Sequence, residues 1–289
     1  MALQTATTTE LDEAQLKVIA ETLFTEEHSR PTTNLLAQFS LGQGEKTLSV
    51  PKVGLMSAAK LIDGVDMTDS QDIGMVVNDV SPVEAGLKVI LTDKLVRQLN
   101  PSAFAIVGQQ MGEAMGRIEE EDAITLFASL NGGTTLGADG SLLTLNNLSG
   151  CISVAKANKY GSQLVIVHHP NAIFAVANDF FAATPQRLDA PSFVDSIVND
   201  FFVFSLNGVP IFESGLIAKI GSVDSGYGAI FDTRAMGMLT SQGLTSGMEH
   251  DNSLRASELV VVKDYIAFEL DDARGAPMRY EIGDLTTST

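Results

Sequence analysis

The chain has 289 residues, of which 45% are hydrophobic and only 19% are charged, below the roughly 25% of an average soluble protein. Its 36 acids and 18 bases give a net charge of −18, which argues against a direct grip on phosphates, because Lys and Arg carry most nucleic-acid affinity. The low charge content indicates uncharged surface that is buried between subunits. The single cysteine, Cys151, excludes an intramolecular disulfide and is expected to be a small buried side chain.

The N-terminal segment reads as an arm. It lacks the basic start and apolar core of a secretory signal, and no apolar run approaches the ~18 residues of a membrane span. Residues 1–9 are rich in Thr and are expected to be disordered until bound. Residues 10–27 carry Leu16, Ile19 and Leu23 at helical spacing, which predicts a short amphipathic helix.

Residues 42–92 contain three short β-like runs separated by Gly, Asp, Ser and Pro. Pro51 and Pro82 favour edge or projecting strands, since central strands do not tolerate proline. The segment has few large apolar residues. It is therefore predicted to be an extended β-hairpin that projects and packs on something else.

The longest helical pattern covers residues 101–130. It opens with Pro101 and Ser102 and is stopped by Asn131, Gly132 and Gly133. At about 1.5 Å per residue this helix would be about 45 Å long and span a whole domain.

Four consecutive acids, Glu119 to Asp122, lie inside that predicted helix. On a wheel of about 100° per residue, Asp122 falls at the centre of the stripe of large apolar side chains, and Glu119 lies at about 60° from it. The stripe contains Phe104, Met111, Met115, Ile118 and Leu126.

The other two acids of the run, Glu120 and Glu121, point toward solvent on this wheel, and Glu121 can pair weakly with Arg117 one turn back. A catalytic pair or metal site needs converging oxygens, which this run does not offer. Asp122 is expected to meet a backbone amide or an arginine of another segment or subunit, because an unpaired buried charge is costly. The candidate arginines are Arg234, Arg255, Arg274 and Arg279. The wheel therefore predicts that Asp122→Ala impairs folding or assembly and that Glu120→Ala is nearly silent.

The second half of the chain alternates helix and strand. Residues 147–158 and 171–183 read as helices around the buried strand QLVIVHH. Asn207 and Gly208 between two apolar runs predict a tight hairpin, because both residues accept positive φ. The C-terminal stretch ELVVVKDYIAFELDDARGAPMRYEIG predicts three strands with a turn at residues 272–275.

Motifs that would carry chemistry are missing. LGQGEKT departs from the phosphate-binding GxxxxGK[ST] pattern, and adjacent His168 and His169 would face opposite sides of a strand. DMTDSQDIG does not have the spacing of a calcium loop, and GxSxG, CxxC and HExxH do not occur. We therefore expect no catalytic, cofactor-binding or metal site, and an enzyme such as an α/β hydrolase or transferase would need a convergent site that is not found.

Four stretches, taken in order, resemble the major capsid proteins of tailed bacteriophages, which share the Hong Kong 97 fold. They are RIEEEDAITLFASLNGG, LVIVHHPNAIFAVAND, LNGVPIFES and GMEHDNSLRASELVVVKDYIAFELDD. The resemblance covers nearly the whole chain and implies an α+β fold in four parts. These are an N-terminal arm (1–41), an extended β-hairpin loop over a neighbouring subunit (42–92), a peripheral domain with a long spine helix (93–145 and 245–289) and an α/β axial domain (146–244).

The resemblance implies a structural subunit that self-assembles as hexamers and pentamers into an icosahedral head in the host bacterial cytoplasm. The shell would enclose double-stranded DNA without sequence-specific binding, would carry a portal and could bind a cement protein. Only about forty residues precede the hairpin, so we expect a separate scaffolding protein. The alternative is an encapsulin-type compartment, which shares the fold but encloses cargo enzymes.

Some relatives form Lys to Asn crosslinks between subunits. Lys46, Lys52 and Lys60 lie in the projecting region, but no partner Asn or catalytic acid is identified, so crosslinking is not expected.

Overall fold

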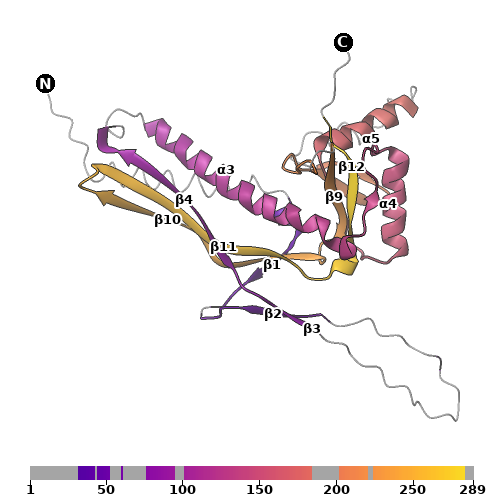
Figure 1. Ribbon diagram of the computed structural model, residues 1–289, viewed down its shortest axis with the longest axis horizontal. Helices are drawn as coiled ribbons and strands as arrows, with labels where there is room; N and C mark the ends of the chain where they lie inside the picture. The colour runs from indigo at the N-terminus through magenta and orange to yellow at the C-terminus, as the bar shows by residue number, and fades with distance from the viewer. Residues whose placement is uncertain are drawn as a thin grey trace, which may run out of the picture.

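The computed structural model describes residues 32–42, 44–52, 60, 76–94, 101–183, 202–220 and 224–283. They form a four-stranded sheet covered by one long helix, a six-stranded sheet flanked by two shorter helices, and a separate two-stranded ribbon (Figure 1). The arm helix expected at residues 10–27 lies outside the described residues.

The four-stranded sheet has the order β1-β10-β11-β4. Its strands are β1 (Ala37–Ser40), β10 (Met236–Asp251), β11 (Ala256–Glu269) and β4 (Val83–Thr92), and α3 (Pro101–Thr125) lies along it (Figure 1). Alternation in the strands turns one side chain in two toward α3, which builds a small core. That core contains Leu91, Met111, Met115, Leu259 and Val261.

The six-stranded sheet has the order β5-β12-β9-β6-β8-β7. Its strands are β5 (Leu136–Gly137), β12 (Gly275–Glu281), β9 (Ser225–Asp232), β6 (Leu164–His168), β8 (Val209–Glu213) and β7 (Phe202–Leu206). All five residues of β6 are buried, as its continuous apolar run predicts. Helices α4 (Leu145–Ala157) and α5 (Pro170–Ala183) lie beside this sheet. They are at the opposite end of the molecule from the C-terminal end of β10 (Figure 1).

The expected projecting hairpin is described in part. β2 (Leu48–Lys52) pairs antiparallel with β3 (Val76–Val80), and the ribbon stands away from both larger sheets (Figure 1). The third run of the expected hairpin is β4, which pairs with β11 instead, so the expectation of one hairpin over residues 42–92 is wrong for residues 83–92. The physical reason is that β4 alternates apolar and exposed residues and buries one face against α3.

The helix predicted over residues 101–130 ends five residues early, and the helical turns that follow it stop at the predicted residues 131–133. α3 ends at Thr125 and continues as two 3-10 turns, η2 (Leu126–Ala128) and η3 (Leu130–Gly133), which end in positive φ values at residues 131–133. The Asn207-Gly208 hairpin is confirmed, with φ of 51° and 80° between β7 and β8.

The C-terminal region differs from the prediction in one respect. It forms two strands, β11 and β12, rather than three, joined by the 3-10 turn η5 (Asp272–Arg274). A fourth 3-10 turn, η1 (Thr33–Leu35), precedes β1.

Candidate functional site

The acidic run on α3 is oriented differently from the wheel prediction. Glu119 and Glu120 are completely buried, whereas Asp122 is exposed and Ile118 is 42% exposed. The predicted stripe counted large apolar side chains and left out glycines. Gly108, Gly112 and Gly116 are all buried, and at 100° per residue they point on average about 80° away from the centre of that stripe.

Glu119 forms a buried ion pair with β11. Its Oε1 lies 2.6 Å from Nζ of Lys263, and the two side chains are 0% and 6% exposed. Such a pair gives little net stability, but removing one partner leaves a buried charge without compensation. The pair therefore fixes how α3 sits on the sheet.

Glu120 anchors the segment that leads into β1. Its carboxylate accepts hydrogen bonds from the Thr32 N–H at 2.9 and 3.1 Å, from the Thr33 N–H at 3.3 Å and from the Thr32 hydroxyl. Thr32 and Thr33 are themselves buried. Burial raises the pKa of Glu120, and these hydrogen bonds partly oppose the shift.

Within the described residues of its own chain, Asp122 has a neutral partner, and not the arginine or backbone amide that the sequence led us to expect; a partner from another subunit stays a prediction. Its Oδ2 accepts a hydrogen bond of 2.7 Å from the Tyr265 hydroxyl. Burial, and then the neighbouring carboxylate, raise the pKa of Tyr265. Arg117 and Glu121 are both exposed, and no ion pair joins them in the described part of the chain.

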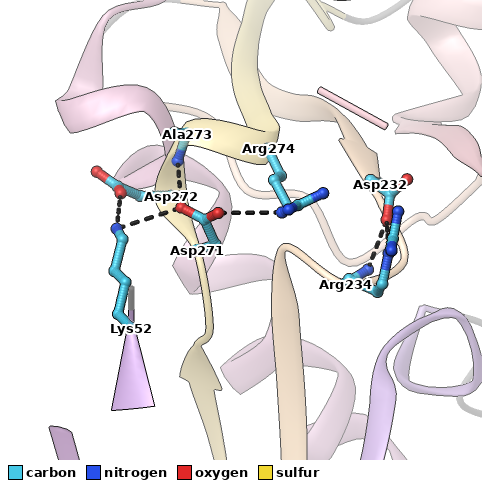
Figure 2. Close-up of polar contacts among 7 residues, drawn as sticks. All are labelled: Lys52, Asp232, Arg234, Asp271, Asp272, Ala273 and Arg274. Carbon is cyan, nitrogen blue, oxygen red and sulfur yellow. Dashed lines mark hydrogen bonds and ion pairs between the residues drawn. The ribbon is translucent and has the colours of Figure 1, made fainter. Parts of the chain in front are cut away.

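Lys52, at the end of β2, reaches the turn between β11 and β12 (Figure 2). Its Nζ lies 2.6 Å from Asp272 Oδ1 and 3.3 Å from Asp271 Oδ1. The hydrogen bond to Asp272 raises the pKa of Lys52, and the same contact lowers the pKa of Asp272. Asp271 also accepts from Arg274 Nε at 3.0 Å and from the Ala273 N–H at 3.4 Å.

A second carboxylate, Asp232, pins the turn between β9 and β10 (Figure 2). It is buried and accepts hydrogen bonds from Arg234 N at 3.1 Å, Arg234 Nε at 3.0 Å and Gln163 N at 3.1 Å. The two turns are also bonded to each other, because Leu270 N and Asp271 N donate to Ala235 O at 2.9 and 3.0 Å. Both turns run between the two larger sheets, so this is one junction.

The remaining predicted residues lie apart from this junction. Lys46 and Lys60 are exposed. Asn207 and Gly208 form the β7–β8 turn, and the Asn207 carbonyl accepts a hydrogen bond of 2.9 Å from Lys156 Nζ on α4. Sequence reasoning missed Glu120, Lys263, Asp271 and Asp272, because their partners are distant in the chain. Glu120 and Thr33 are 87 residues apart, and Lys52 and Asp272 are 220 residues apart.

Burial favours the neutral forms of two side chains, His168 and Cys151. Burial lowers the pKa of His168 to about 3, so its imidazole is neutral, and its Nδ1 accepts a hydrogen bond of 2.9 Å from His169 N. Burial raises the pKa of the Cys151 thiol, which lies 3.3 Å from the Tyr280 hydroxyl.

Within the described ranges, no group of three or more His, Cys, Asp or Glu residues could hold a metal ion. The same ranges contain no helix with the length and apolar character needed to cross a membrane.

Taken together, the polar contacts join segments that are distant in sequence and organise the subunit. A family model described as phage capsid protein matches residues 77–276. No curated protein sequence matches the chain.

Among solved structures, the capsid of a native GTA particle is similar, with a TM-score of 0.67 and 13% identity over 87% of this chain and 91% of that one. The head of Helicobacter pylori bacteriophage KHP40 has a TM-score of 0.66 and 8% identity over 89% and 91%. The SrpI encapsulin complex of Synechococcus elongatus PCC 7942 has a TM-score of 0.61 and 15% identity over 91% and 92%. At these identities the likeness concerns the fold.

Proposed function

We propose, since this chain belongs to the phage capsid protein family, that it assembles as hexamers and pentamers into the icosahedral head of a tailed double-stranded DNA bacteriophage. Membership of this family identifies the chain as a major capsid protein. Its similarity to the GTA capsid and the KHP40 head indicates a Hong Kong 97-like fold. The observation that carries the proposal is the family match over residues 77–276. It includes α3 and most strands of both larger sheets, and leaves out β1 and all but the start of β12.

The parts of the subunit would take the following roles. Residues 1–41 form an N-terminal arm, and the β2–β3 ribbon belongs to an extended loop that lies over a neighbouring subunit. Residues 93–145 and 245–289 form a peripheral domain with α3 as its spine helix, and residues 146–244 form an axial domain around the symmetry centres. The strand pairing supports adding β1 and β4 to the peripheral sheet.

The partners follow from this role. The shell would use a separate scaffolding protein during assembly in the host bacterial cytoplasm, and would incorporate a portal and a cement protein. Its DNA would be enclosed without sequence-specific contacts. The net charge of −18 supports this, because an acidic protein does not adhere to packaged phosphates.

An encapsulin-type compartment is the second candidate, favoured by the likeness to the SrpI encapsulin complex. The contents of the shell distinguish the two functions, because a phage head holds nucleic acid and an encapsulin holds a cargo protein.

The first prediction concerns assembly. The full chain, expressed alone and together with the other products of its own phage, should give closed or partial shells under negative-stain electron microscopy. Shells from the complete phage should contain nuclease-protected DNA. Particles that contain a co-purifying enzyme and no DNA would favour the encapsulin reading, and a chain that stays small in both settings would contradict the proposal.

A further inference from the structure

We propose that Lys52 is an electrostatic latch that couples the direction of the β2–β3 ribbon to the junction between the two larger sheets. The junction consists of the turns Asp232–Ala235 and Leu270–Arg274, which connect β9 to β10 and β11 to β12. Figure 2 shows Lys52 reaching this junction from the end of β2.

The ribbon needs such an anchor because it is intrinsically weak. In the described part of the chain it has two strands of five residues each, and a two-stranded ribbon alone is marginally stable at best. Its burial pattern alternates between intermediate and exposed along β2, and Val77 in β3 is 48% exposed. A few contacts at its base therefore set where it points.

Each turn of the junction is held by an ion pair between residues close in sequence. Asp232 binds Arg234 and Asp271 binds Arg274, so each turn carries its own carboxylate and arginine. Turn residues at the ends of elements are where a protein bends. Lys52 is the side chain by which the ribbon joins these charges, 219 and 220 residues before its two partners in the chain.

The strength of the contact suits a reversible device. The side chains of Lys52, Asp271 and Asp272 are 39%, 30% and 37% exposed, so water and salt weaken their attraction. Pairs exposed to this degree change a population by a factor of about 1.4 to 5 each. The two pairs share one ammonium group, so their effects are less than additive. Together they favour the latched direction by roughly two- to tenfold, which contacts with a neighbouring copy can overcome. This last step rests on the proposed function, whereas the latch is a property of the single subunit.

The test uses hydrogen exchange in the unassembled full chain, read on peptides that cover residues 48–52 and 76–80. Lys52→Met keeps the length of the side chain and removes its charge. It should raise the exchange rate in both strands by roughly two- to tenfold, and about 1 M salt should bring the wild type toward the same rate. Lys46→Met is the matched control, because Lys46 is exposed and forms no ion pair with another described residue. It should leave both strands unchanged.

A charge swap separates the latch from a general packing effect. Lys52→Asp should release the ribbon more than Lys52→Met, and adding Asp272→Lys should restore protection at least in part. Unchanged exchange in Lys52→Met, or failure of the swap to restore protection in a folded chain, would overturn the latch. Neither result depends on shell formation, so the latch and the proposed function can fail separately.

Discussion

At the scale of single residues, Glu120 is the side chain for which the structure differs most from the sequence prediction. Its hydrogen-bond donors Thr32, Thr33 and Ser214 are all neutral. A buried carboxylate held by backbone N–H groups ties two segments together, and its loss leaves those donors without a partner. The exposed Asp122, two residues further on, has one partner and free access to water.

Glu120→Ala should therefore destabilise the unassembled subunit by about 2–4 kcal/mol, because it leaves buried donors unsatisfied and opens a cavity. Asp122→Ala should cost about 1 kcal/mol or less, since its site is exposed. Urea denaturation of both variants measures the difference. Equal losses would contradict the role assigned to Glu120, and a larger loss in Asp122→Ala would restore the wheel prediction.

The pH dependence of stability tests the burial of Glu120 separately. Its pKa is raised in the folded state, so the folded chain binds this proton more readily than the unfolded chain, where the pKa is about 4.3. As pH falls through the folded pKa toward about 4, the wild type should gain stability relative to Glu120→Gln, which cannot titrate there. Parallel stability curves for the two proteins from pH 7 to pH 4 would contradict this.

At the scale of elements, local patterns predicted what local physics decides. The apolar run of β6, the Asn207-Gly208 turn and the stop after α3 depend on near neighbours and are confirmed. The buried face of α3 was misjudged because glycines take part in close packing without an apolar side chain to count. The pairing of β4 with β11 joins residues more than 160 positions apart, and nothing local specifies it.

The connection between α4 and β6 gives an element-scale prediction. A Cβ on Gly161 would lie 1.7 Å from Asp232 Oδ2, so Gly161→Ala must displace the carboxylate that pins the β9–β10 turn. It should cost about 2–4 kcal/mol, by breaking a buried hydrogen-bond network. Gly150→Ala on α4 meets no atom within 4 Å and should instead stabilise the chain by about 0.5–1 kcal/mol. Thermal unfolding of both variants checks the opposite signs.

At the scale of the whole molecule, the candidate site could not be predicted because its members come from distant parts of the chain. Lys52 was singled out for its place in a projecting loop. Of its two partners, Asp272 was predicted only as a turn residue and Asp271 was not singled out at all. The resemblance of ordered motifs supplied the family, which the match over residues 77–276 then established. Individual contacts required the three-dimensional structure, because a carboxylate finds its donor through space.

The junction and the long strands that leave it also have a mechanical consequence. β10 has 16 residues and starts directly after the turn that Asp232 and Arg234 hold, so at about 3.4 Å per residue it is about 50 Å long. If the four-stranded sheet rotates as a rigid body about this turn, the far end of β10 moves farthest. A rotation of about 5° at this turn would carry the far end through about 4 Å, given that length. Angles too small to disturb the packing around Asp232 are thus magnified at the far end into displacements the size of a side chain.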